Sequence, residues 1–103
     1  MLERDIRKLL KDRVEKYGGE IRAVAWLGRR HAPDVLVLLP GTPGTKSTGW
    51  NPVGMCHPFI ETKAPGGVPR DGQLREHERM RAAGCDVLVI STREQLDKWL
   101  PPA

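Results

Sequence analysis

The chain has 103 residues, of which 39% are hydrophobic and 29% charged, and a formal net charge of +4. This length allows a single domain over residues 1–103 with one core. The composition excludes a disordered acidic tail and a membrane protein, since no apolar run approaches the ~20 residues of a membrane-spanning helix. The charged start also lacks the apolar stretch of a signal peptide, so we expect a cytoplasmic protein without a membrane partner. The positive charge suits an anionic partner such as nucleic acid, although many ordinary basic proteins share it.

Apolar periodicity and the positions of Gly and Pro divide the chain into seven expected elements. The expected helices cover 2–16, 73–83 and a last segment that follows a Ser91 capping box and runs to 100. The expected strands cover 20–27, 34–39, 57–63 and 86–90. A long loop over 40–56 and a turn over 64–72 precede and follow the third strand. The loop is rich in Pro and Gly, and loops of this length are usually functional or mobile. The helix between the third and fourth strands implies a crossover, which predicts an α/β (α+β) fold with a mixed four-stranded sheet flanked by helices.

The cysteines do not form a zinc framework. Cys56 and Cys85 lack the paired spacing of such sites, and the three histidines show no i, i+4 spacing. A zinc site from Cys56 and His57 together with Cys85 or His77 stays conceivable. Two unpaired thiols in a reducing compartment are the simpler interpretation.

The strand over 57–63 ends in a charged pair. Side chains alternate along a strand, so Glu61 and Lys63 point to the same face. Taken alone, this pair is also what a decorated sheet edge looks like.

Asp34 makes the pair more informative. If the second and third strands are antiparallel neighbours, Asp34 at the start of one should lie beside Glu61 and Lys63 at the end of the other. Two carboxylates suit a hard divalent cation such as Mg²⁺, and the Thr62 backbone carbonyl could add an oxygen ligand. Lys63 would then lie beside the metal.

Gln73 follows the turn after Lys63. It shares a helical stripe with His77, Met80 and Gly84, and this stripe should face the sheet and direct Gln73 to the same edge. The alternative is a solvated Gln in the first turn of a helix.

Three motifs therefore follow one another in the chain: Pro33-Asp34, then Glu61-Thr62-Lys63, then Gln73. This order resembles the PD-(D/E)xK nuclease superfamily, whose restriction-endonuclease-like core has the same αβββαβ order. The closer resemblance is to the VRR-NUC (virus-type replication-repair nuclease) domain in its stand-alone phage or bacterial type. The resemblance covers almost the whole chain, and the stretches that carry it are 28–34, 59–67, Gln73 and 83–89.

The family also has an acidic residue at the start of its first helix, and Glu3 matches it. Glu3 could bind metal, directly or through water, or orient a ligand. The alternative is favourable charge at a helix N-terminus. The chain departs from the family pattern just before Pro33-Asp34, where family members often have a glycine and this chain has His31-Ala32, which leaves the shape of that turn open.

The resemblance implies a metal-dependent endodeoxyribonuclease that hydrolyses phosphodiester bonds with Mg²⁺ or Mn²⁺. Asp34, Glu61 and the Thr62 carbonyl would hold the ions. Lys63 would deprotonate or position the attacking water, or neutralise phosphate oxygens, and Gln73 would fix the water or the scissile phosphate. Arg29, Arg30 and the basic face of the first helix are candidates for DNA-backbone contacts, and Lys46 and Trp50 in the 40–56 loop are candidates for contacts with DNA or a second subunit.

Single-domain members of this family resemble phage-encoded enzymes that act on branched DNA, including four-way junctions, as homodimers. We therefore expect a Holliday-junction-resolvase-like homodimer for DNA repair in a bacterial or phage-infected host cell, since a two-fold dimer supplies two active sites. Trp26, Trp50 and Trp99 are candidates for its interface. The alternatives are a less selective or flap- or nick-directed nuclease, and a non-catalytic DNA-binding module.

Overall fold

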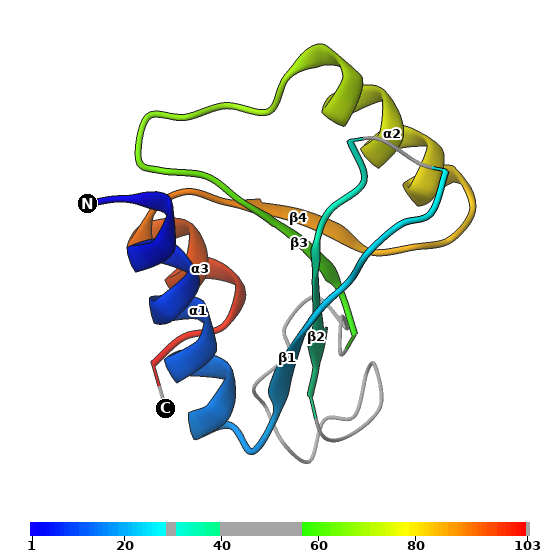
Figure 1. Ribbon diagram of the computed structural model, residues 1–103. Coiled ribbons are helices and arrows are strands. Elements are labelled where there is room, and N and C mark those ends of the chain that lie inside the picture. Colours follow the sequence, from blue (N-terminus) through cyan, green and yellow to red (C-terminus); the bar gives the residue numbers. More distant parts are fainter. Residues whose placement is uncertain (29–30, 40–56, 103) are drawn as a thin grey trace.

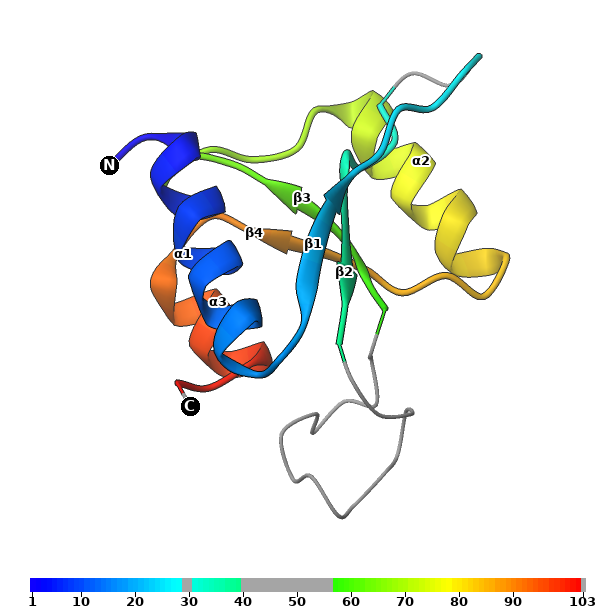
Figure 2. The same cartoon turned by 60° about the horizontal axis from the view of Figure 1, so that its bottom comes forward.

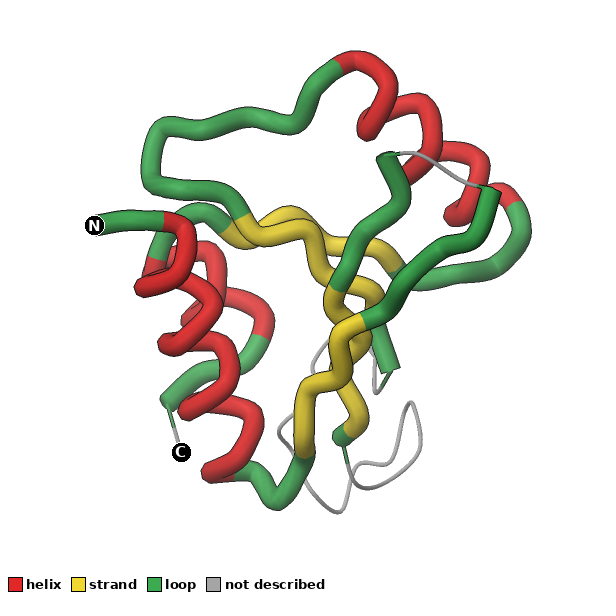
Figure 3. Tube along the Cα trace, viewed as in Figure 1, coloured by secondary structure: helices red, strands yellow, loops and turns green. Residues whose placement is uncertain are grey.

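The computed structural model describes residues 1–28, 31–39 and 57–102. In chain order its elements are α1 (Glu3–Lys16), β1 (Glu20–Ala23), β2 (Val35–Leu38), β3 (Phe59–Thr62), α2 (Asp71–Ala82), β4 (Val87–Ile90) and α3 (Arg93–Trp99). Helices lie on both sides of the sheet: α1 and α3 pack together on one side and α2 lies on the other (Figure 1). The turned view in Figure 2 and the tube in Figure 3 show the same three layers.

The sheet has the order β1-β2-β3-β4. β1 pairs with β2 and β2 with β3 in antiparallel fashion, whereas β3 and β4 are parallel and connected through α2. The predicted mixed four-stranded sheet and the αβββαβ order are thereby confirmed. β3, which carries the predicted carboxylate Glu61 and directly precedes Lys63, is an inner strand with a partner on each side.

The core lies between the sheet and the α1–α3 layer. The apolar positions of α1 repeat at helical spacing and face side chains that alternate along the strands. The core residues are Ile6, Leu10, Val14, Val35, Val37, Leu39, Ile60, Ile90, Leu96, Trp99 and Leu100. Trp99 is buried among them, so its candidacy for a subunit interface is wrong.

A buried arginine joins α1 to the end of the chain. Arg13 Nη1 donates to the Leu100 carbonyl at 2.7 Å and lies 2.7 Å from Asp97 Oδ1. The Tyr17 hydroxyl also donates to the Pro101 carbonyl. These contacts attach the last residues of the chain to the C-terminal half of α1.

Gly19 is required by the close approach between the end of α1 and β2. A Cβ atom at this position would overlap the backbone carbonyl oxygen of Leu38 and press on the side chains of Val14 and Leu39. Any larger residue would therefore move α1 away from the sheet.

Every element has at least one end that differs from the prediction, most by one or two residues, and three of these differences are informative. β1 ends at Ala23 rather than 27, although one further ladder bond follows, in which the Val24 N–H donates to the Asp34 carbonyl at 2.9 Å. α2 begins at Asp71, two residues early, because Gln73 caps it at Arg70. α3 is capped by Thr92 rather than Ser91: the Thr92 hydroxyl accepts from the Gln95 N–H at 3.1 Å.

No helix within residues 1–28, 31–39 and 57–102 is both long and apolar enough to cross a membrane.

Candidate active site

Asp34 and Glu61 face each other where β2 begins and β3 ends. The antiparallel register pairs Val35 with Ile60 and Leu36 with Phe59. One further step along this register puts Asp34 opposite Glu61 on the same face of the sheet. The predicted neighbourhood of the second and third strands is confirmed, and it brings the two carboxylates together.

Glu61 is the buried member of this pair, with 7% of its surface exposed. Burial raises the pKa of Glu61 to about 7, and the positive charge of Lys63 opposes this rise. Asp34 and Glu3 raise the pKa further by repulsion, whereas Arg7 lowers it. Four charged groups from α1, β2 and β3 therefore act on one carboxyl group, and the expected Glu3, Asp34 and Lys63 are among them.

Arg7 is a member of the site that the sequence analysis missed. Its Nη2 lies 3.2 Å from both carboxylate oxygens of Asp34 and 3.2 Å from the Thr62 hydroxyl oxygen. The position of Arg7 in the sequence could have indicated this role, because Arg7 lies one turn after Glu3 on the face of α1 that carries Leu10. A basic residue on a core-facing stripe needs a partner inside the fold rather than in solvent.

Thr62 and Lys63 continue β3 to the edge of the site. Thr62 is fully buried and directs its hydroxyl to Arg7, on the α1 side of the sheet. The Lys63 N–H donates to the Ile90 carbonyl at 3.1 Å, so the backbone remains attached to β4 beyond the last strand residue. Lys63 itself is half-buried.

His77 lies on α2 with none of its surface exposed, and its Nε2 is 3.5 Å from Oε1 of Glu61. Burial lowers the pKa of His77, and the nearby positive charge of Arg81 lowers it further. Met80 is buried on the same face. The expectation that the His77–Met80 stripe of this helix faces the sheet is thus confirmed.

Gln73 has a different partner from the one expected. Its Oε1 accepts a hydrogen bond of 2.8 Å from the Arg70 N–H, which satisfies a backbone donor at the start of α2. The structure therefore gives Gln73 a capping role and leaves its amide nitrogen as a donor.

The backbone before Asp34 is held by two aromatic rings. Trp26 Nε1 donates to the Pro33 carbonyl at 2.6 Å, and its ring lies 5.3 Å from that of Phe59. Trp26 is therefore packed within its own chain. His31, at the position where the family often has glycine, adopts the left-handed backbone that glycine favours, with φ of 69°.

The donors at this edge fit a hard divalent cation. In the described part of the chain, no three His, Cys, Asp or Glu side chains lie close enough to enclose an ion. Mg²⁺ commonly takes only one or two protein carboxylates and keeps its remaining ligands as water or phosphate oxygens. Glu61 Oε1 is buried and without a hydrogen-bond partner among the described residues, so the site contains an acceptor oxygen whose bonding capacity is unused.

Several predicted residues lie outside the described part of the chain. These are Arg29, Arg30, Lys46, Trp50, Cys56 and the rest of the 40–56 loop.

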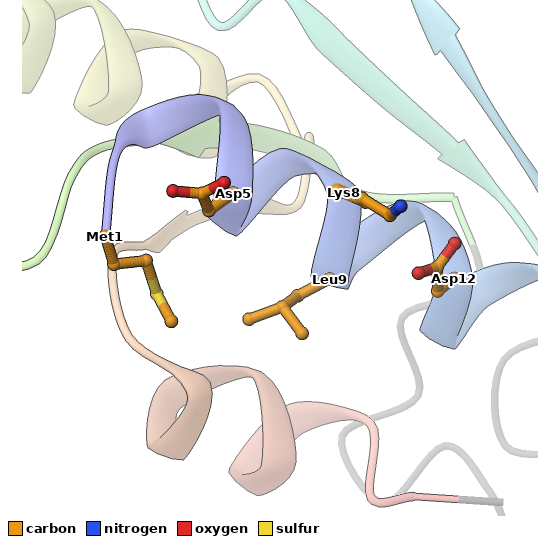
Figure 4. A pocket seen from close by; sticks show the side chains of 5 residues that line it. All are labelled: Met1, Asp5, Lys8, Leu9 and Asp12. Carbon is orange, nitrogen blue, oxygen red and sulfur yellow. The ribbon is translucent and has the colours of Figure 1, made fainter.

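A pocket of about 490 Å³ lies elsewhere on α1, bounded by Met1, Asp5, Lys8, Leu9 and Asp12 (Figure 4). At 100° per residue, these positions cover the face of the helix opposite Glu3 and Arg7. The pocket is therefore separate from the carboxylate edge.

Comparisons with known proteins agree with this arrangement. The chain is similar to a protein named "Putative nuclease p44" from Acyrthosiphon pisum secondary endosymbiont phage 1, with 37% identity over 99 residues. The matched region covers 96% of this chain and 91% of that protein. It is also similar to a solved structure described as "VRR_NUC domain", with a TM-score of 0.72 and 37% identity over 93% of this chain and 90% of that one. No model of a protein family matches the sequence. On the strength of the two matches, the chain belongs to the VRR-NUC family of nucleases.

Proposed function

We propose that this nuclease is a metal-dependent endonuclease that hydrolyses phosphodiester bonds in branched DNA as a homodimer. The observation that supports the proposal most directly is the gathering of charge at one sheet edge. Glu3, Asp34, Lys63 and Arg7 all act on the buried carboxyl of Glu61. Such a concentration of opposite charges around a perturbed carboxyl is typical of a catalytic site.

In this proposal Asp34 and Glu61 would hold Mg²⁺ or Mn²⁺ together with the Thr62 backbone carbonyl. Glu3, whose charge also acts on Glu61, would take part through a bound water. When bound, such a cation lowers the pKa of a water molecule and stabilises the negative charge that develops on the phosphate. Manganese and magnesium both prefer oxygen ligands, which is the donor type that these residues offer.

Lys63, Gln73 and the basic residues have separate roles in this proposal. Lys63 provides a positive charge next to Glu61, where it orients the attacking water or neutralises a phosphate oxygen. The Gln73 amide nitrogen, left free by the helix cap, donates to the same water or to the phosphate. Arg29, Arg30 and Lys46 contact the DNA backbone.

A substrate panel tests this function. Labelled linear duplex, flap, nicked and four-way DNA are incubated with the protein in Mg²⁺, in Mn²⁺ and in EDTA. We expect metal-dependent cleavage with preference for the four-way substrate. Comparable cutting of linear duplex would favour the less selective nuclease, and preference for flaps or nicks would favour a nuclease directed to those structures. Binding without metal-dependent cutting of any substrate would leave the non-catalytic DNA-binding module.

Two substitutions test the site assignment. Asp34→Asn removes a ligand charge from an exposed side chain, and Lys63→Ala removes the ammonium group. Each should lower the cleavage rate by about 100-fold or more while unfolding stays cooperative. Glu94→Gln, an exposed carboxylate on α3, is the matched control and should cut like the wild type. Full activity of either site variant would refute that residue's role.

A further inference from the structure

The contact between His77 and Glu61 joins two elements that are distant in the sequence. His77 lies in the middle of α2, and Glu61 lies near the end of β3. Nε2 of the ring is 3.5 Å from Oε1 of the carboxyl group. His77 has no exposed surface, so water has no direct access to the ring.

The polar atoms that face each other in this contact are unsatisfied within the described part of the chain. Among the described residues, neither ring nitrogen of His77 has a hydrogen bond, and neither does Oε1 of Glu61. A buried polar atom without a partner loses its hydration and gains nothing in return. One proton carried on Nε2 and directed at Oε1 satisfies a donor and an acceptor at once.

The separation is a few tenths of an ångström longer than an ordinary N–H···O bond, and a small rotation of either side chain closes it. Both side chains are attached to well-packed elements. β3 is bonded on both sides, and the next buried residue of α2 on this face, Met80, anchors the helix one turn later.

We propose that His77 is a positioning residue for Glu61: its Nε2–H holds Oε1, which fixes the carboxylate plane and keeps Oε2 available as the ligand oxygen. This inference rests on the proposed metal-dependent function. The role is the one that hydrogen-bonded neighbours of metal-binding carboxylates have generally, and their loss costs about 10- to 100-fold in metal affinity or activity.

A purely structural role would be satisfied by any side chain of the same volume. The two roles are separated by a pair of substitutions. His77→Phe keeps a planar ring and removes the donor. His77→Gln places an amide nitrogen where Nε2 stands and restores the donor. Met80→Leu is the control, because it alters the same buried face of α2 one turn away.

The first measurement is Mn²⁺ binding by calorimetry in the absence of DNA. His77→Phe should bind Mn²⁺ at least 10-fold more weakly than the wild type, and His77→Gln should recover most of the affinity. In cleavage assays at saturating metal, His77→Phe should lower kcat and leave KM for DNA nearly unchanged. Met80→Leu should behave as the wild type in both assays.

The second measurement needs neither metal nor activity. Nitrogen-15 spectra of the wild-type imidazole should show the neutral tautomer with the proton on Nε2, and Glu61→Gln should shift the Nε2 resonance more than the Nδ1 resonance. This readout also covers the case in which His77→Phe fails to fold.

Three results would overturn the inference. They are wild-type metal binding and kcat in a folded His77→Phe protein, equal losses in the Phe and Gln variants, and a wild-type imidazole protonated on Nδ1 alone. If the wild type itself neither binds Mn²⁺ nor cuts DNA, the proposed function fails first. The nitrogen spectra then still decide whether the contact exists.

Discussion

The carboxyl group of Glu61 is buried in the protein, where the ionised form is disfavoured. Its backbone is part of the inner strand β3, and its side chain is covered by α2. Burial raises the pKa of Glu61 to about 7, which means that the proton competes with any cation for this carboxyl near neutral pH.

Glu61 should therefore make stability depend on pH. Its pKa of about 7 in the folded chain lies above the ordinary value of 4.5, so the folded state binds more protons between these two values. The stabilisation is complete below pH 4.5 and is lost as the pH rises to about 7, with an upper bound of about 3 kcal/mol. Metal-free wild type should lose stability over this window, and Glu61→Gln should lose less.

Urea unfolding in EDTA at several pH values measures this difference. Glu94→Gln, whose carboxylate is exposed, should keep the wild-type slope. Parallel curves for wild type and Glu61→Gln would contradict the raised pKa.

Strand alternation was enough to predict the pairing of Asp34 with Glu61. It needs only the two-residue period of a strand and one antiparallel neighbour, and both are local properties of the sequence. Arg7 and His77 were not predicted as members of the site, because each reaches it across a helix–sheet contact. Such packing depends on the rotation of a whole helix, which periodicity defines only as a stripe.

The first turn of α2 is packed against the connection that leads into β2. A Cβ atom on Gly72 would lie 2.8 Å from Cδ2 and Nε2 of His31, which is closer than van der Waals contact allows. The imidazole therefore lies against the start of this helix and would have to move aside for a larger side chain at position 72. This is one way in which the chain accommodates a bulky residue in a turn where its relatives often have glycine.

A double-mutant cycle tests this contact. Gly72→Ala should stabilise an ordinary helix by up to about 1 kcal/mol. In this chain the exposed His31 imidazole must move aside for the added methyl group, so the gain should be smaller or absent. In a His31→Gly background the imidazole is absent, and Gly72→Ala should give the full gain. Unfolding free energies from urea titrations give the interaction term, and additive effects would exclude the contact.

The types of all seven elements were predicted correctly, but each element has at least one end that was not. β1 pairs with β2 only as far as Ala23, and the alternating pattern of residues 20–27 does not show this limit. α2 begins before its predicted first residue because the side chain of Gln73, which was predicted as a site residue, accepts a hydrogen bond from the Arg70 N–H and caps the helix. These ends depend on a pairing register or a cap geometry, neither of which apolar periodicity encodes.

At the scale of the whole molecule, the 11.5 kDa chain forms little more than the nuclease core. Under the proposed function, the one carboxylate edge of each chain would cut one strand at a time. Cleavage of two strands at a junction therefore needs a second copy, and we expect a two-fold dimer in solution.

Light scattering coupled to size exclusion measures the oligomeric state. The expected mass is twice that of the 11.5 kDa chain, and it should persist on dilution through the concentrations used for cleavage. A monomer at those concentrations that still cuts both strands of a junction would contradict the dimer.

The position of β3 has a consequence for how DNA is selected. The strand is bonded to β2 and β4 and has helices over both faces, so its backbone opens only when much of the molecule opens with it. A carboxylate on such a strand is fixed before DNA arrives. The deformation needed to bring a phosphate to it must then come from the nucleic acid, and the free energy of bending differs among DNA structures. Under the proposed function, a rigid edge would thus choose substrates by their flexibility, and stiff linear duplex would be disfavoured without any contact that rejects it.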